Sequence, residues 1–160
     1  MGMKICSCVA AAFLRCEDKY LLLKRSAAAK HYPNVWCGVG GGMKDDEFND
    51  PRKAVIREIY EESGIEEEYI NNLNLKYIRV NKHFEGISYL YVYFADVTKT
   101  DIWQTYEGTL EWIPREEFFN REVAMESLLQ HYFSEGINTD DLYIYTTYNG
   151  ICTITPFESE

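Results

Sequence analysis

One helix is bounded by sequence signals at both ends, and it constrains the fold more than any other segment. Asp50 is a favourable N-cap, Pro51 suits the first helical position, and Gly64 suits the residue that ends a helix. The intervening residues predict a helix about 20 Å long, at 1.5 Å per residue. Its apolar side chains, among them Val55 and Ile59, can pack on a neighbouring sheet.

Runs of strand-forming residues cover much of the remaining chain. They lie at residues 5–14, 19–24, 75–80, 87–97, 109–113, 142–148 and 151–156. The first two predict a hairpin-like pair, and Asn149-Gly150 is a strong turn signal between the last two. A further short strand is expected at 35–37, an interruption of regular structure at the glycines of 38–42, and a second helix at 122–133. Together these segments predict an α+β domain with a mostly β centre and about two packed helices.

Length and composition exclude several classes of partner. At 160 residues, the chain is expected to form a single domain over 1–160. The net charge of −10 repels phosphate backbones, so nucleic acid is not an expected partner. No apolar run approaches the ~18 residues of a membrane-spanning helix, so no membrane association is expected. The five cysteines lack C-x-x-C spacing, which indicates free thiols and a cytoplasmic protein.

Three carboxylates share one face near the end of the first helix. Glu58, Glu61 and Glu62 stand at positions i, i+3 and i+4. Like charges at this spacing destabilise a helix, and the negative end of the helix dipole adds to the repulsion. A hard divalent cation with oxygen ligands would compensate, whereas the alternative is an acidic face in contact with solvent. An EF-hand is excluded, because residues 46–50 lack its ligand alternation and its glycine.

The segment around this helix resembles the Nudix box, G-x5-E-x7-R-E-U-x-E-E-x-G-U, in which U is a bulky aliphatic residue. Gly41 and Glu47 match its first half, and residues 57–65 (REIYEESGI) match its second half. Nine residues separate Glu47 from Arg57, where the family usually has seven. We interpret the difference as a two-residue expansion of the loop before the helix, which leaves the position of Glu47 to be determined. The resemblance extends from the early LLLKR run to the EGTLEW segment and so covers most of the chain.

The resemblance implies the Nudix fold, a mixed sheet sandwiched by helices (α/β/α), and hydrolysis of a diphosphate compound by attack of water on phosphorus. It implies Mg²⁺ or Mn²⁺ as cofactor, with Glu58, Glu61 and Glu62 as ligands and a backbone carbonyl of Gly40 or Gly41 as a further one. Glu107 in EGTLEW is the expected ligand outside the box, and the competing residues are Glu85 and Glu111.

The resemblance also suggests catalytic and phosphate-binding roles. Glu58, Glu61 or Glu107 would act as general base, with Glu61 or Glu58 preferred. Arg57 would neutralise part of the acidic cluster and orient one carboxylate. Lys24 and Arg25 stand where related enzymes hold phosphates, and the planar fork of Arg25 makes it the preferred contact.

The substrate is the least determined feature. Residues 36–41 (WCGVGG) resemble the W-N-G-V/F-G-G segment of the MutT-like hydrolases of oxidised purine nucleoside triphosphates, such as 8-oxo-dGTP. In this segment Trp36, Cys37 and Gly41 are the expected substrate contacts. Cys37 replaces the asparagine that contacts the base, and a thiol hydrogen-bonds poorly. Phe84 and Tyr106 are further aromatic residues that could stack on a base.

Other functions of the same site stay open. The substrate could instead be a nucleotide sugar, a dinucleoside polyphosphate, or an isoprenoid diphosphate that is isomerised. In a different class, the chain could be a non-catalytic domain that senses a nucleotide. An exposed edge of the 87–97 strand would allow a homodimer.

Overall fold

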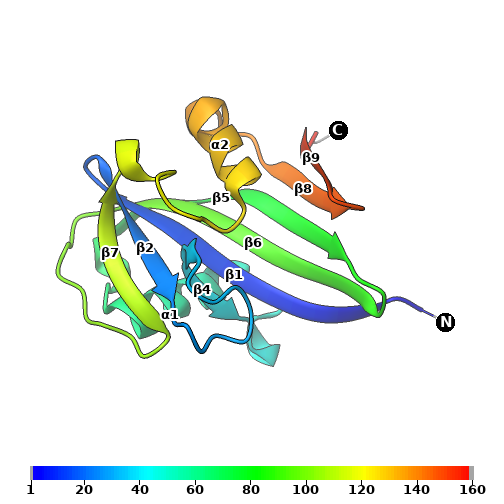
Figure 1. Ribbon diagram of the computed structural model, residues 1–160, viewed down its shortest axis with the longest axis horizontal. Coiled ribbons are helices and arrows are strands. Elements are labelled where there is room, and N and C mark those ends of the chain that lie inside the picture. Colours follow the sequence, from blue (N-terminus) through cyan, green and yellow to red (C-terminus); the bar gives the residue numbers. More distant parts are fainter. Residues whose placement is uncertain (1, 159–160) are drawn as a thin grey trace.

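A mixed β-sheet runs through the molecule and carries a helix on each face (Figure 1). The computed structural model describes residues 2–158, and within them nine strands join one sheet. The strands are β1 (Lys4–Cys16), β2 (Lys19–Arg25), β3 (Trp36–Cys37), β4 (Val39–Gly42), β5 (Ile70–Lys82), β6 (Gly86–Val97), β7 (Gly108–Pro114), β8 (Tyr143–Tyr148) and β9 (Ile151–Pro156). The helices are α1 (Pro51–Ser63) and α2 (Glu126–Ser134), with 3₁₀ turns at Asp45–Glu47, Glu67–Tyr69, Arg115–Glu117 and Gly136–Asn138.

The strand order is β3-β2-β1-β6-β5-β8-β9, with β4 paired to β1 and β7 paired to β2. The β1–β6 and β5–β8 pairs are parallel and the other pairs are antiparallel. Parallel pairs need long crossover connections, and the connection from β1 to β6 contains α1. The mixed sheet and the α+β class predicted from the sequence are thereby confirmed.

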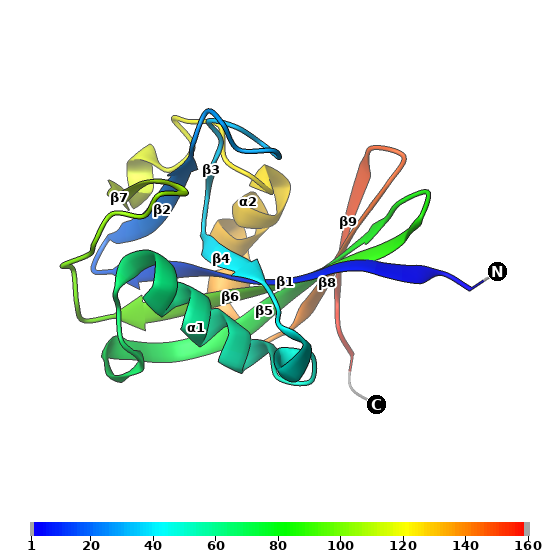
Figure 2. The same ribbon diagram turned by 90° about the horizontal axis from the view of Figure 1, so that it is seen from below.

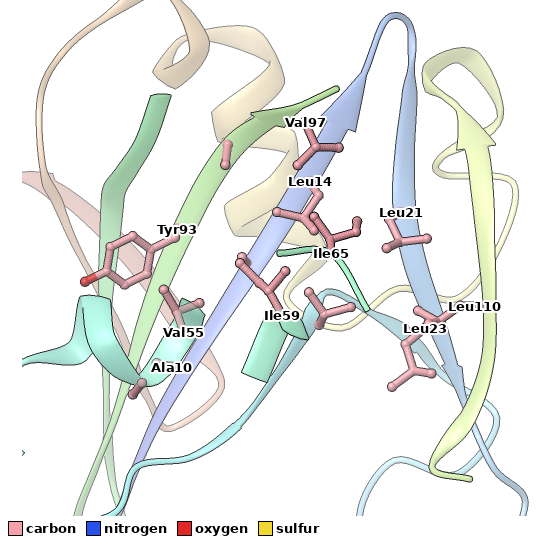
Figure 3. Packing of buried hydrophobic residues seen from close by; sticks show 14 residues of the cluster. Ala10, Leu14, Leu21, Leu23, Val55, Ile59, Ile65, Tyr93, Val97 and Leu110 are labelled. Carbon is pink, nitrogen blue, oxygen red and sulfur yellow. The ribbon is translucent and has the colours of Figure 1, made fainter. Parts of the chain in front are cut away.

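Alternating residues of β1 divide the core into two halves, one on each face of the sheet. Ala10 and Leu14 pack with Val55 and Ile59 of α1 (Figure 3). Phe13 packs on the other face with aromatic residues and with α2. Figure 2 shows the two helices on opposite sides of the sheet. This period-of-two alternation is the ordinary consequence of strand geometry.

The bounds of α1 follow its sequence signals. The side chain of Asp50 accepts a hydrogen bond from the backbone N–H of Lys53 at 3.0 Å. At the other end, Gly64 adopts φ 76° and its N–H donates to the carbonyl of Tyr60 at 2.9 Å. The cap at each end therefore places Glu58, Glu61 and Glu62 in the last two turns of the helix.

Three expectations require correction. Residues 39–42 form β4 and not an interruption, because glycine lets the two backbones approach: a Cβ on Gly40 would lie 2.6 Å from the Cβ of Ala11. The second helix begins at Glu126 and not at Glu122, because the backbone at 122–124 pairs instead with Trp36. The strand at 87–97 offers no free edge, because β6 lies between β1 and β5.

Two further features concern the cysteines and the helices. All five cysteines carry free thiols. Between residues 2 and 158, neither helix is long and apolar enough to cross a membrane.

Gly64, which ends α1 in the left-handed conformation, packs close to Trp103, and substitution by alanine tests this contact. Gly64→Ala should destabilise the protein more than Gly150→Ala, although both glycines have φ 76°. Both variants incur the roughly 1–2 kcal/mol cost of a left-handed alanine. At Gly64 the new Cβ would also lie 2.8 Å from the ring of Trp103, whereas at Gly150 nothing lies within 4 Å. Urea unfolding of both variants measures the difference; equal losses would show that Trp103 does not constrain this turn.

Candidate functional site

The acidic residues of α1 lie beside the glycine strand β4. Glu58 and Glu62 are buried against the sheet, and the side chain of Glu61 is half-exposed. This difference follows from their positions on the helix, since Glu58 and Glu62 are one turn apart and share a row. The three carboxylates therefore share one side of α1, with Glu58 and Glu62 toward the core and Glu61 toward solvent.

Glu62 is the most buried of the three, with 4% of its surface exposed. Its Oε2 accepts a hydrogen bond from the backbone N–H of Gly40 at 2.8 Å. Its Oε1 is buried and has no hydrogen-bond partner among the residues that the structure describes. Burial raises the pKa of Glu62 to about 8, and the negative charges of Glu107 and Glu58 add to the effect. This carboxylate lacks a positive partner at the site.

Arg57 forms hydrogen bonds with Glu47, Glu58 and Glu61. Its Nε and Nη2 donate to the two carboxylate oxygens of Glu47, at 2.7 and 2.9 Å. Its Nη1 donates to Glu58 at 2.6 Å and to Glu61 at 2.9 Å, and Nη2 also donates to the carbonyl of Gly42 at 3.1 Å. Each guanidinium nitrogen is therefore engaged, which holds Glu58 and Glu61 in place.

Glu47 contacts Arg57 despite the two-residue expansion of the loop between them. It is 2% exposed, and its Oε2 also accepts the backbone N–H of Lys44 at 2.9 Å. The 3₁₀ turn at Asp45–Glu47 presents it to Arg57, and the additional residues lie in the turn before Asp50. The ion pair with Arg57 lowers the pKa of Glu47 to about 2.

The glycines of β4 allow this strand to lie against the carboxylates. A Cβ on Gly41 would lie 2.7 Å from each carboxylate oxygen of Glu58, so the Glu58 side chain would have to leave this position. On Gly42, by contrast, a Cβ would meet nothing within 4 Å. Glycine is thus needed at position 41 for the acidic site itself. The predicted metal contact through the Gly40 carbonyl stays a prediction, since the contact seen here uses its N–H.

The donor set fits a hard divalent cation. Within residues 2–158, no three acidic, histidine or cysteine side chains already converge as a metal-binding group, and Arg57 instead engages Glu58 and Glu61. The ionised form of Glu62 has no positive partner among the described residues, and carboxylate oxygens are the ligands that Mg²⁺ and Mn²⁺ prefer. Glu58, Glu61 and Glu62 are therefore the residues that would hold such an ion.

Glu107 is the best placed of the acids outside the helix. It is exposed, directly before β7, and its charge contributes to the raised pKa values of Glu58 and Glu62. Glu111 stands opposite Leu22, whose side chain belongs to the core half on the far face of the sheet. Glu85 lies in the turn before β6, beside the start of β1. Strand β4 pairs with β1 farther along that strand, at residues 9–12. Neither competitor shares the surroundings of Glu62.

The predicted substrate contacts divide between the two faces of the sheet, since Cys37 packs against the core half beside α1 whereas Trp36 packs against the half beside α2. Lys24 Nζ lies 6.0 Å from the centroid of the Trp36 ring, and Arg121 Cζ lies 4.9 Å from it. Sequence reasoning missed Arg121, because it reaches Trp36 only through the backbone pairing at 122–124. Arg25 directs its Nε to the carbonyl of His31 at 2.9 Å. A cationic environment therefore surrounds the first residue of the WCGVGG segment.

Two further expectations about base recognition stay predictions. The Cys37 thiol donates to the carbonyl of Leu23 at 3.6 Å, and burial raises its pKa to about 11. Phe84 is fully exposed in the same turn as Glu85, and Tyr106 is exposed beside Glu107. Neither ring is positioned by a stacking partner among the described residues.

Acid titration tests the role of Glu47. Because the folded pKa lies below the ordinary value of 4.5, ionised Glu47 stabilises the fold above about pH 4.5 and loses this effect as the pH falls through about 2. Glu47→Gln should therefore cost on the order of 2 kcal/mol at pH 7, with a difference from wild type that shrinks below pH 4.5. Asp46→Asn, which removes an exposed pair with Lys53, is the control and should change stability little. Urea unfolding across this pH range gives the answer; a difference independent of pH would contradict the ion-pair explanation.

Comparison with known proteins identifies the family of this chain. A family model described as the NUDIX domain matches residues 6–132. The chain is 32% identical over 115 residues to diphosphoinositol polyphosphate phosphohydrolase 2 of Mus musculus and of Homo sapiens. These matches cover 72% of this chain and 57% of each relative, so the chain spans little more than half the length of these curated relatives.

Solved structures share the fold at lower identity. A MutT protein from Bacillus halodurans superimposes with a TM-score of 0.66 and 23% identity, over 94% of this chain and 97% of that one. An Ap4A hydrolase from C. elegans superimposes with a TM-score of 0.64 and 20% identity, over 80% of this chain and 96% of that one. With the family match over residues 6–132 and the intact acidic helix, this chain belongs to the NUDIX domain family.

Proposed function

We propose that this chain is a metal-dependent hydrolase that cleaves a diphosphate linkage in a small, phosphate-rich substrate by attack of water on phosphorus. The observation that carries the proposal is the buried Oε1 of Glu62, which lacks a partner beside Glu58 and Glu107. A buried carboxylate without a positive partner is costly in a merely structural site. We also propose that the protein works in the reducing cytoplasm, where its five thiols would stay free.

Each side chain of the site has a proposed role. A bound Mg²⁺ or Mn²⁺ would neutralise phosphate charge and acidify the attacking water. Glu58, Glu61 and Glu62 would hold the ion, with Glu107 as a further ligand. Arg57 positions Glu58 and Glu61 through its hydrogen bonds. We propose Glu61, whose side chain is half-exposed, as the acceptor of the water proton, with Glu58 as the second candidate.

The hydrogen bond of Cys37 to the protein and the names of the curated relatives favour a phosphate-rich substrate over a purine-specific one. The Cys37 thiol makes its hydrogen bond to the carbonyl of Leu23. Arg25 supplies the positive charge that acts on Cys37, alongside the negative charges of Glu62 and Glu107. The names of the curated relatives, diphosphoinositol polyphosphate phosphohydrolases, agree with this class. Hydrolysis of oxidised purine nucleoside triphosphates is the second candidate, supported by the resemblance of WCGVGG and EGTLEW.

A substrate panel tests the proposed activity. Diphosphoinositol polyphosphate, dinucleoside polyphosphates, nucleotide sugars, and normal and oxidised nucleoside triphosphates are incubated with Mg²⁺, with Mn²⁺ or with chelator, and phosphate products are quantified. We expect metal-dependent release that is fastest for the most phosphate-rich compounds. Fastest release from oxidised purines would instead favour the second candidate, and binding without turnover would favour a nucleotide sensor.

A variant of Glu62 provides an inactive reference for the substrate panel. Glu62→Gln should lower turnover at least tenfold while the protein stays folded, because it removes the charge at the unpartnered oxygen. Glu66→Gln, an exposed position paired with Lys99, is the matched control and should leave turnover unchanged. Wild-type turnover in Glu62→Gln would remove this residue from the site.

Adjacent glycines allow a geometric test. Gly41→Ala should lower turnover at least tenfold, because its Cβ would displace the carboxylate of Glu58. Gly42→Ala should be close to wild type, because its Cβ enters open space. Initial rates at saturating metal and circular dichroism of both variants separate loss of the site from loss of the fold; equal rates would show that the position of Glu58 does not matter for turnover.

A further inference from the structure

A cavity lies on the face of the sheet opposite α1. It has a volume of about 570 Å³ and lies between the sheet, the C-terminal end of α2 and the segment that follows it. Its lining includes Phe13, Phe94 and Tyr132, which belong to the core half that packs with α2. The acidic site lies beside the other core half, so this cavity is separate from it. Its volume is in the range of small-molecule sites.

The apolar side of the cavity is a stack of aromatic rings. Phe94 and Tyr132 lie parallel with their centroids 3.5 Å apart, and Phe13 stacks on Phe94 at 5.3 Å. These rings are almost fully buried by their packing, so their positions are held by the core. The small part of these rings that faces the cavity suits contact with the apolar body of a small ligand.

Lys76 supplies a buried positive charge to the same cavity. The register of β5 against β6 shifts between Leu75 and Tyr77, so Lys76 is the additional residue of a β-bulge. Bulges redirect side chains, and here the side chain is only 6% exposed. Its Nζ donates to the carbonyl of Thr139, which satisfies one of its three donors.

Among the described residues, the ammonium of Lys76 has no counter-ion. The guanidinium of Arg15, which also lines the cavity, does have one. Arg15 forms an ion pair with Asp96 at 2.7 Å, and Asn72 donates to the second oxygen of that carboxylate at 3.0 Å. No carboxylate lies within 4 Å of Lys76 in the part of the chain that the structure describes. Burial lowers the pKa of Lys76, while Asp140, which also lines the cavity, and Asp141 oppose the shift without forming an ion pair with it. A buried ammonium in this state is stabilised by any anion that enters the cavity.

We propose that this cavity binds a small organic anion, whose carboxylate or phosphate group pairs with Lys76 and whose planar body lies against the aromatic wall. The proposal adds a second site to the proposed hydrolase and does not depend on its activity. The polar residues Asn72 and Asn74 at the cavity wall offer further hydrogen bonds to the bound anion.

Calorimetric titration in the presence of chelator tests the proposal directly. Adenosine monophosphate and benzoate are the phosphate and carboxylate probes, and adenosine and benzyl alcohol are their uncharged counterparts. We expect at least one anion to bind, at least tenfold more tightly than its uncharged counterpart. Lys76→Gln should weaken this binding at least tenfold, whereas Glu62→Gln, on the opposite face, should leave it unchanged.

A second variant keeps the test informative if Lys76→Gln does not fold. Asn74→Asp places a negative charge at the cavity and should also weaken anion binding at least tenfold. Asn120→Asp, an exposed residue outside the lining, is its matched control. Absence of binding by both anions, equal binding by folded Lys76→Gln, or loss of binding in Glu62→Gln would each overturn the proposal.

Discussion

The guanidinium of Arg57 is the interaction on which the acidic site depends. It joins Glu47 before the helix, Glu58 and Glu61 on the helix, and the carbonyl of Gly42 on the neighbouring strand. Without it, several carboxylates would repel one another at the negative end of a helix dipole. One planar side chain with five donors can satisfy this many oxygens in fixed geometry, which a lysine cannot do.

Arg57 leaves Glu62 out of its network, and this division gives the site its chemical character. Glu62 is held by the Gly40 N–H on one oxygen and has an unpartnered second oxygen. The remaining need for positive charge is what a divalent cation would meet. The glycines at 40 and 41 make the arrangement sterically feasible, since any side chain there would collide with β1 or with Glu58.

Much of this site could be predicted from the sequence because its signals are local. Asp50, Pro51 and Gly64 determine where α1 begins and ends, and helical periodicity then places the glutamates on one face. The strand at residues 39–42 cannot be predicted locally, since glycine has low strand propensity and only the partner strand β1 shows why small residues are needed. The start of α2 cannot be predicted locally either, because the backbone at 122–124 pairs with Trp36, a residue distant in sequence.

The sequence by itself determined the α+β class, the capped helix and the acidic cluster, because caps, periodicity and motif spacing act within a few residues. Tertiary structure alone decided that Glu47 meets Arg57 across the expanded loop, that Arg121 lies beside Trp36, and that β6 is internal. It also decided that a bulge buries Lys76 beside an aromatic wall. These features depend on strand order and register, and contacts between distant segments leave no local pattern from which to read them.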